Sequence, residues 1–482
     1  MTIENREHGT DAQDIGLNEA QQSAYPVLRR ERTWGPIAFI AIASSLSAGT
    51  WLFPVGGAVA GYAPSWAGTL LMIGGMMIGT GLLLVGTVPI QAKFGVDSVT
   101  STAPYLGVVG AKMSIVLVWL PIAAWNAILT IIMGRSVVRI LARLGVVTLA
   151  DADVNKWGNI VGSLMLFGIL LFTIGGAEVL KRLEIVLAII ALIIVLIIFG
   201  LLFVKFGPSE IGSAKPLSPL PDHQQNYMTV VELMMGSALS WWPWIGGLVR
   251  LVPSPRASLP GVLLGLGLTV PVVSAASLWS SLVAGNPDPS VWMITVGGTA
   301  WGLVALILIV KANIGTIAIN LFVSGVAANR IPAIQNRVRW SWNLIIMCVP
   351  VTAVVLFFGD TFMEQTPKIM AFSGLFYAPL CAIAAVDYFI LRRKRVSIRG
   401  FYDESKDAPY YYWRGINPIA VLAAILGVGM YLLLLNPLTL EAHGPFKWIS
   451  ASIPTFIVAA LAYYFGSKLV TIPAGRGDYK QR

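Results

Sequence analysis

A related sequence occurs twice in the chain, first as Ser47-Ala-Gly-Thr-Trp51-Leu-Phe-Pro54-Val-Gly56-Gly57 and then as Ser237-Ala-Leu-Ser240-Trp241-Trp-Pro243-Trp-Ile-Gly246-Gly247. Ser, Ala, Trp and the closing Gly-Gly are identical, although the proline is displaced by one position. Each copy interrupts a long apolar segment with small, hydroxyl-bearing residues that weaken a helix. Because a broken helix in lipid exposes backbone polar groups, paired breaks are typical of a transporter's binding site. Chance similarity is the alternative, and the matching position of the copies in the two halves favours a repeat.

The composition indicates an integral membrane protein. Of the 482 residues, 56% are hydrophobic and 12% are charged, and the mean hydropathy is +0.76. A soluble domain usually carries about 25% charged residues, so this chain has too few to cover a surface that faces water. We therefore expect the lipid bilayer to surround most of the chain.

The chain contains twelve apolar runs that are long enough to cross a bilayer, for which about 20 residues suffice. They lie near 35–59, 65–90, 113–134, 158–175, 183–204, 227–248, 258–284, 296–326, 340–359, 369–391, 416–435 and 448–466. No segment between these runs is long enough to form a soluble domain. The first run follows a polar tail and continues into further spans, which is not the pattern of a cleaved signal peptide.

The distribution of Lys and Arg predicts the orientation of the spans. With twelve spans both termini lie on one side, and that side carries most of the basic residues, including Arg392-Arg-Lys-Arg395. The positive-inside rule places this side in the cytoplasm, so we expect a multi-pass protein of the cell membrane with both termini cytoplasmic. The net charge of +10 reflects this bias and requires no nucleic acid. Arg135, Arg139 and Arg143 run against the rule.

The polar residues exclude several kinds of chemistry. Cys348 and Cys381 lie inside predicted spans, and the three histidines lie in tails or loops. The sequence contains no metal-ligand cluster, nucleophile elbow or phosphate-binding glycine loop. Transport driven by ATP hydrolysis would require a nucleotide-binding domain, for which the chain has no candidate. We therefore expect no enzyme activity, no catalytic residue, no bound metal and no cofactor.

Four stretches carry a more specific signal. They are Glu31-Arg-Thr-Trp34 with Gly49-Thr-Trp51, Phe94-Gly-Val-Asp-Ser98 through Pro104-Tyr-Leu-Gly-Val-Val-Gly110, Trp241-Trp-Pro-Trp-Ile-Gly-Gly-Leu-Val-Arg250 with Pro253-Ser-Pro-Arg256, and Asp387-Tyr-Phe-Ile-Leu-Arg392-Arg with Tyr410-Tyr-Tyr-Trp413-Arg-Gly-Ile-Asn417-Pro-Ile-Ala420. In this order they resemble the nucleobase–cation symport family, which includes cytosine, purine, hydantoin and allantoin permeases. The chain departs from the family at Gly247, where an Asp usually precedes the Arg that is Arg250 here.

The resemblance implies an all-α integral membrane fold with two inverted five-helix repeats and two further helices. The first and sixth helices are then broken and meet near the middle of the bilayer. The chain divides into a cytoplasmic N-terminal tail, a first repeat, an extracytoplasmic linker, a second repeat, a cytoplasmic loop, helices eleven and twelve, and a cytoplasmic C-terminal tail. The corresponding ranges are 1–34, 35–204, 205–226, 227–391, 392–415, 416–466 and 467–482.

The resemblance also implies where a substrate binds. The family's third-helix aromatic corresponds to Trp125, which would stack on a heteroaromatic ring, and Asn126 is its neighbour. Leu129 stands where hydantoin-type members carry an amide. In the eighth helix Asn320 is the preferred amide and an alternative register favours Asn313, while a bond to a neighbouring helix is the structural alternative for each. The other expected substrate-binding residues lie at the two breaks and are Gly49, Thr50, Gly236, Ser237, Ser240 and Trp241.

The resemblance further implies a site for a coupling cation between the first and eighth helices, and the sequence leaves open whether the cation is sodium or a proton. Ser44, Ser47 and Thr316 offer hydroxyl oxygens for it. Lys311 suggests a second interpretation, in which its ammonium points into the core, replaces sodium and becomes titratable through burial. The structural alternatives for Lys311 are an ion pair with Glu232 and a side chain that snorkels to the membrane surface.

These features predict a secondary active transporter that imports a small planar nitrogen heterocycle by alternating access, coupled to a cation. Nucleobases, hydantoins, allantoin and related vitamins are the candidate substrates. The alternatives are an amino-acid or amine permease of the same architecture and a membrane sensor that binds such a solute without transporting it. Short loops and the lack of a signalling domain favour transport. The sequence indicates neither the exact substrate nor an oligomeric state.

Overall fold

The computed structural model describes residues 25–174, 193–331, 334 and 337–479. The outer parts of both predicted tails and the junction of the predicted fourth and fifth spans lie outside the described residues. The described part is helical and contains two isolated β-bridges but no strand. Its α-helices are α2 (Pro36–Ser47), α3 (Leu52–Ala60), α4 (Ser65–Gly86), α5 (Val88–Phe94), α6 (Ala103–Leu106), α7 (Val108–Met113), α8 (Ile115–Arg143), α9 (Asp151–Ile174), α11 (Gly207–Ser213), α12 (His223–Leu239), α13 (Trp242–Val249), α14 (Pro255–Pro260), α15 (Thr269–Ala284), α16 (Pro289–Ala328), α18 (Trp340–Phe362), α19 (Thr366–Ala385), α20 (Pro418–Leu434), α21 (Phe446–Ile449) and α22 (Ser452–Gly466).

Many of these helices can cross a membrane. Seven in the described part are long and apolar enough, or nine if each of two bent pairs is one span. The bent pairs are α2 with α3, at 64°, and Ile193–Lys205 with α11, at 97°. Nine falls three short of the twelve predicted spans, because Trp340–Leu391 is one helical stretch, α20 has only 17 residues, and the pair of α12 and α13 is not among the nine.

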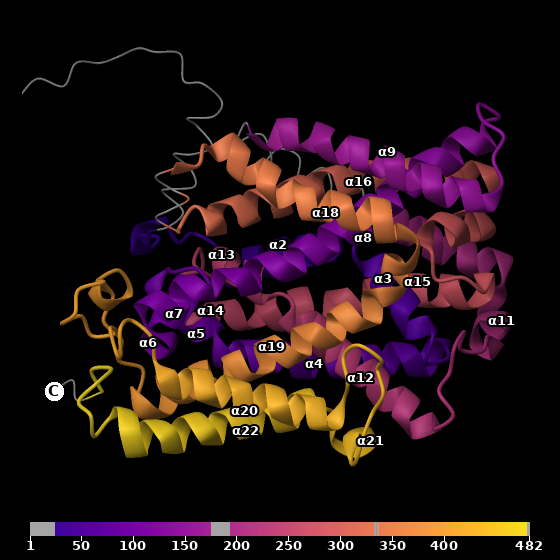
Figure 1. The fold of residues 1–482 in the computed structure, drawn as a ribbon. Helices are drawn as coiled ribbons and strands as arrows, with labels where there is room; N and C mark the ends of the chain where they lie inside the picture. Colours follow the sequence, from indigo (N-terminus) through magenta and orange to yellow (C-terminus); the bar gives the residue numbers. More distant parts are fainter. Residues whose placement is uncertain (1–24, 175–192, 332–333, 335–336, 480–482) are drawn as a thin grey trace, which may run out of the picture.

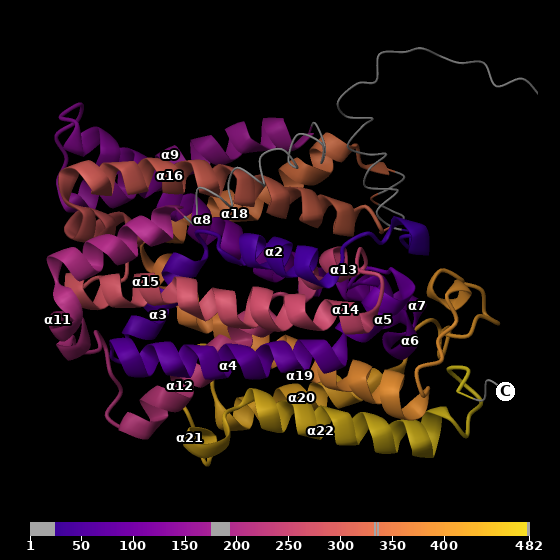
Figure 2. The same ribbon diagram turned by 180° about the vertical axis from the view of Figure 1, so that it is seen from behind.

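The helices pack in three groups (Figure 1 and Figure 2). In the first group α8 packs against α9 and α16, and α18 packs against α8 and α9. In the second group α4 packs against α12, α3 packs against α15, and α2 packs against the π-helical stretch Gly261–Leu268. The third group contains α19, α20 and α22, and α19 also packs against α12. The second group therefore lies between the other two.

Glycines allow the helices within a group to approach closely. A Cβ atom at Gly134 of α8 would lie 1.9 Å from the carbonyl oxygen of Gly158 in α9. A Cβ atom at Gly79 of α4 would lie 2.7 Å from the carbonyl oxygen of Met235 in α12. Small residues are needed at such crossings because lipid is as apolar as the side chains, so that close packing has to hold the helices together.

Both copies of the repeated sequence contain a helix break, as predicted. α2 ends at Ser47 and α3 begins at Leu52, whereas α12 ends at Leu239 and α13 begins at Trp242. The second helix of each pair carries its proline, Pro54 or Pro243, within its first three residues. Proline is tolerated there because a backbone N–H in the first turn has no partner within the helix.

Both ends of the described chain lie at the same end of the bundle, which we call the terminal end (Figure 1). A buried ion pair fixes the chain there. Arg392 Nε donates to Asp387 Oδ2 at 2.6 Å, and its Nη atoms donate to the carbonyl oxygens of Pro104 and Gly477 at 2.7 Å each. The segment that follows α19 is therefore tied to the start of α6 and to the C-terminal residues.

Candidate functional site

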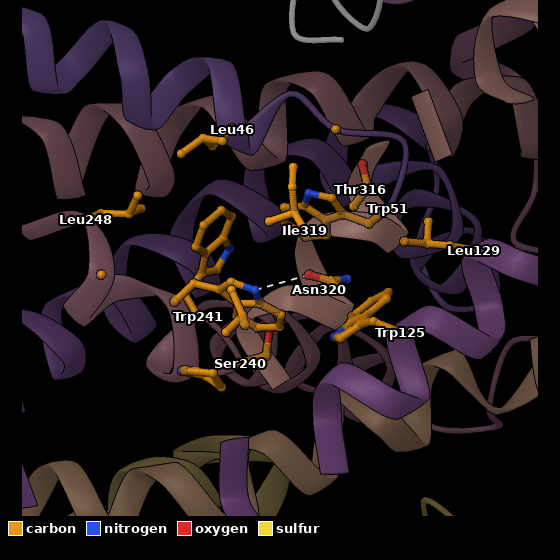
Figure 3. Close-up of a pocket in the computed structure, with 15 residues that line it drawn as sticks. Leu46, Trp51, Trp125, Leu129, Ser240, Trp241, Leu248, Thr316, Ile319 and Asn320 are labelled. Carbon is orange, nitrogen blue, oxygen red and sulfur yellow. Dashed lines mark hydrogen bonds between the residues drawn. The ribbon is translucent and has the colours of Figure 1, made fainter. Parts of the chain in front are cut away.

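The two helix breaks border a cavity of about 320 Å³ between the first and second helix groups (Figure 3). Its walls come from α2 and the break after it, from α8 and α16, and from α13 and the break before it. None of the described residues that line the cavity is charged. The lining includes four indole rings, those of Trp51, Trp125, Trp241 and Trp244, and three polar side chains, those of Ser240, Thr316 and Asn320.

The indoles pack against one another edge to face. The ring of Trp51 lies 5.9 Å from that of Trp125 at an interplanar angle of 74°, and 5.7 Å from that of Trp241 at 69°. Trp241 in turn lies 6.1 Å from Trp244 at 62°. In Figure 3 Trp125 and Trp241 stand on opposite sides of Asn320. The cavity therefore presents aromatic surfaces in several orientations, which suits a flat, apolar-faced ligand.

A chain of hydrogen bonds reaches the cavity through Asn320. Trp244 Nε1 donates to Asn320 Oδ1 at 3.1 Å, and Asn320 Nδ2 donates to Asn126 Oδ1 at 2.9 Å. Asn320 borders the cavity, whereas Asn126 lies behind it, with 1% of its surface exposed. The two amides thus connect α13, α16 and α8 next to the site.

Asn313 occupies a different environment from Asn320. It is fully buried, accepts a hydrogen bond from Thr50 Oγ1 and donates through Nδ2 to the carbonyl oxygen of Leu129 at 3.2 Å. These bonds join α16 to the first break and to α8. Of the two amides considered from the sequence, Asn320 is the one that faces the cavity.

The structure divides the predicted substrate-binding residues into two sets. Those that line the cavity are Gly49, Trp125, Ser240, Trp241 and Asn320. Those that lie outside its lining are Thr50, Asn126, Gly236, Ser237 and Asn313. Gly236 serves packing, because a Cβ atom there would lie 2.0 Å from the carbonyl oxygen of Met370 in α19.

The residues predicted to bind the cation also lie in different environments. Thr316 lines the cavity and donates to the carbonyl oxygen of Ala312 at 3.1 Å. Ser47 is fully buried at the end of α2, and its hydroxyl has no hydrogen-bond partner among the described residues. Ser44 accepts a hydrogen bond from Thr269 Oγ1 at 3.1 Å.

Of the interpretations of Lys311, the structure contradicts the one in which its side chain points into the core and agrees with the exposed, snorkelling alternative. Lys311 is exposed on the outer side of α16, where a long side chain can carry its charge toward water. Glu232 is not its partner. The Glu232 carboxylate accepts hydrogen bonds from the backbone N–H groups of Ala451 and Ser452 at 3.0 Å and from the Ser452 hydroxyl at 2.6 Å. It therefore caps α22 instead.

Trp51 and Trp244 line the cavity although the sequence did not single them out as site residues. Both belong to the repeated sequence, and Trp51 occupies the position that corresponds to Trp241. Treating the two copies as equivalent would have found Trp51. Trp244 follows the second break, where the helical phase starts anew.

Two further cavities lie beyond the central one. The cavity at the terminal end has a volume of about 150 Å³ and shares Pro243, Gly247 and Val323 with the central cavity. The cavity at the opposite end has a volume of about 780 Å³ and shares no lining residue with the central cavity. The site therefore continues toward the terminal end and is separated from the opposite end.

Charged residues border each of these outer cavities. At the terminal end Asp97 pairs with Arg330 at 2.7 Å, and Arg250 lines the same cavity. Burial opposes ionisation of Asp97, but the charges of Arg330 and Arg250 outweigh it and lower the pKa of the carboxyl. At the opposite end Arg135 pairs with Asp288 at 3.2 Å and with Asp360 at 3.0 Å. These carboxylates balance the charge of Arg135, one of the three arginines that the sequence analysis placed against the positive-inside rule.

The family model described as permeases for cytosine and purines, uracil, thiamine and allantoin matches residues 26–446. The chain belongs to this family. It is a family of permeases and not of enzymes, and the resemblance seen in the sequence is thereby confirmed.

Individual relatives are more distant. An allantoin permease of Bacillus subtilis (strain 168) is 29% identical over 150 residues, which cover 28% of this chain and 29% of the relative. The match thus spans less than a third of that relative. The inward-facing conformation of Mhp1 shares the fold with a TM-score of 0.75 and 16% identity, over 95% of this chain and 97% of that one. Mhp1 in a closed conformation with bromovinylhydantoin bound, described as a nucleobase-cation-symport-1 family transporter, has a TM-score of 0.71 and 17% identity, over 95% and 99%. A substrate-bound, outward-open Na+-coupled sialic acid symporter has a TM-score of 0.55 and 12% identity, over 95% of each chain.

Proposed function

We propose that the chain is a secondary active transporter that imports a small planar nitrogen heterocycle through a cell membrane by alternating access. The observation that carries this proposal is the cavity at the two helix breaks. Four indoles line it, and none of its described lining residues is charged. Membership of the permease family supports the same function.

The chemistry of the cavity favours a neutral aromatic or near-planar ring. Stacking of a base on an aromatic side chain contributes roughly 1–3 kcal/mol, and every such ring has a face that can stack. An amino acid would bring a carboxylate and an ammonium into a cavity whose lining contains no charged side chain, at a high cost of desolvation. Nucleobases, hydantoins, allantoin and related vitamins remain the candidate class.

We extend the proposal to the arrangement in the membrane. Twelve crossings follow if α18 and α19 cross separately and if α20 and the pair of α12 and α13 each form a span. The two breaks support two inverted five-helix repeats, since an odd number of spans turns the second copy over. The bias of Lys and Arg supports placing the terminal end, with both termini, in the cytoplasm.

We propose a cation as the coupling partner, held between α16 and the break that follows α2, where Thr50 donates to Asn313. The buried Ser47 hydroxyl, which has no hydrogen-bond partner among the described residues, supports this location. Thr316 at the cavity and Ser44 in α2 are the other hydroxyl candidates. Hydroxyl and carbonyl oxygens are suitable ligands for sodium, whereas a coupled proton would require a titratable group, which these three residues do not supply.

Uptake into liposomes tests the function. The purified chain is reconstituted, and uptake of radiolabelled uracil, cytosine, adenine, hydantoin, allantoin and thiamine is measured with and without gradients of sodium and of pH. We expect saturable uptake of at least one ring, driven by one of the two gradients. Binding of a ring without uptake would support a sensor instead, and no response to any ring would contradict the proposed substrate class.

A further inference from the structure

Asn320 is a polar residue of the cavity wall, and its side chain lies between two hydrogen-bond partners. Its Oδ1 is 3.1 Å from the indole Nε1 of Trp244, and its Nδ2 is 2.9 Å from Oδ1 of Asn126. Within the described part of the chain, these are the hydrogen bonds that its side chain makes. Figure 3 draws the bond to Trp244 as a dashed line that ends on the Asn320 oxygen.

The chemistry of the indole decides which way round the Asn320 amide points. The oxygen and nitrogen of an asparagine are similar in size, so that shape alone leaves two orientations open. An indole N–H only donates, and the Asn320 atom beside Trp244 therefore has to be the acceptor Oδ1. The Asn320 nitrogen is then directed toward Asn126, which meets it with an oxygen. One donor-only group thereby orients two amides in series.

We infer that Trp244 is a positioning residue, which fixes the direction in which Asn320 reads the hydrogen-bonding edge of the ligand. The inference rests on the proposed function. After its two bonds within the protein, Asn320 retains one acceptor site on Oδ1 and one N–H on Nδ2. These match a ring N–H and a neighbouring ring carbonyl. The substrate class is accordingly a cyclic amide with its N–H intact, in preference to a ring whose nitrogen is alkylated.

The location of Trp244 supports this role. It is the third residue of α13, directly after the second break, and it lines the cavity together with its ring neighbour Trp241. Asn320 and Asn126 lie in α16 and α8, which pack against each other. The N–H that orients Asn320 therefore comes from α13, whereas the two amides that it orients belong to α16 and α8.

The experiment removes one N–H group. W244F keeps a large aromatic ring and deletes the indole N–H. W242F is the matched control, because Trp242 is fully buried in the same helix, does not line the cavity, and its Nε1 has no hydrogen-bond partner among the described residues. Equilibrium binding of uracil, hydantoin and allantoin, and of a derivative of each in which every ring N–H is methylated, is measured on the purified full chain.

We expect W244F to weaken binding of the unmethylated ring about tenfold, which is the order of one net hydrogen bond. Binding of the N-methyl derivative should not change, so that the ratio of the two affinities falls in W244F and stays constant in W242F. An equal loss for both ligands, or an unchanged ratio, would overturn the inference.

A second variant covers the case in which W244F does not fold. N126A leaves the bond from Trp244 to Asn320 in place, so it should keep the ratio of the native chain. A ratio that falls in N126A would contradict the inference, because the direction of the Asn320 amide would then depend on Asn126. If the native chain binds the rings but the ratio does not respond to W244F, only the inference fails. If the native chain binds none of the rings, the proposed function fails, and the inference falls with it.

Discussion

Each copy of the repeated sequence closes with a Gly-Gly pair. The two copies pack alike at the first glycine of this pair and differently at the second. A Cβ atom at Gly56 would lie 2.3 Å from a carbonyl oxygen, and one at Gly246 would lie 2.3 Å from a backbone nitrogen. At Gly57 a Cβ atom would lie 2.7 Å from the carbonyl oxygen of Pro287, but at Gly247 it would meet nothing within 4 Å. The same residue is thus enclosed in the first copy and open in the second.

This difference shows which way the site opens. Gly57 borders the cavity at the opposite end, which is separate from the central one, whereas Gly247 borders both the central cavity and the one at the terminal end. One sequence motif therefore helps to close one end of the bundle and leaves a passage at the other. In the alternating-access cycle proposed above, this unequal packing corresponds to the state that is open toward the terminal end.

Loss of Arg135 should have the largest effect, because this residue helps to close the opposite end. Its side chain is 5% exposed and pairs with Asp288, which is 12% exposed. Removing one partner of a buried ion pair leaves the other charge uncompensated and costs about 3–5 kcal/mol. We expect R135M to lower the free energy of unfolding in detergent by this amount. R143M, in which an exposed arginine of the same helix is changed, should have little effect, and equal losses would contradict the account.

Gly57 and Gly247, the second glycines of the two Gly-Gly pairs, provide a smaller and more direct contrast in stability. G57A introduces a methyl group against backbone, and such overpacking typically costs about 1–3 kcal/mol. G247A introduces the same group into open space and should leave the stability unchanged. Thermal unfolding of both variants in detergent measures the difference. Similar melting temperatures would show that the two copies are packed equally in solution.

Trp125 tests the aromatic wall that faces both copies. W125A removes one of the indoles that line the cavity, and the lost stacking should weaken substrate binding by roughly 1–3 kcal/mol. Expression and thermal stability of the variant serve as controls for folding. An unchanged affinity in a well-folded variant would remove Trp125 from the site.

Loss of the Asp97–Arg330 ion pair at the terminal end should have the smallest effect on stability, because this pair borders an open passage. The pKa of Asp97 is lowered in the folded chain, so the pair contributes stability above the pKa of an unfolded Asp, about 3.9, and loses it as the pH falls through the lowered value. We expect D97N to cost about 1 kcal/mol at neutral pH, because asparagine loses the charge but keeps an oxygen that can accept hydrogen bonds from Thr100 and Arg330. Its melting temperature should approach that of the native chain in acid. A difference that grows toward low pH would have the wrong sign.

Much of the fold could be predicted because the bilayer constrains it. Apolar runs of the right length indicated the spans, and the small polar residues of the two copies indicated the breaks near Ser47 and Ser240. The family resemblance placed Trp125 at the site, where the structure has it at the cavity wall.

The orientation of single side chains could not be predicted in the same way. α16 is apolar on every side over 40 residues, so no periodic pattern distinguishes the face of Asn320 from that of Lys311. Trp244 follows a break, across which the helical phase cannot be extrapolated. The partners of Arg135 are distant in the sequence, in α18 and at the start of α16, and only the packing of the first helix group brings them together.

Thiol labelling of S240C examines both the location of the site and the direction in which it opens. Ser240 lines the central cavity, and the native Cys348 and Cys381 are both buried, so the native chain is the control without a reactive thiol. A membrane-impermeant maleimide is applied to each side of oriented vesicles, with and without substrate, and A58C reports on the cavity at the opposite end. We predict that S240C is labelled from the side of the termini and protected by substrate, while A58C is labelled from the other side. Labelling of S240C only from the side opposite to the termini, or labelling that saturating substrate does not slow, would contradict a substrate site at the two helix breaks that opens toward the terminal end.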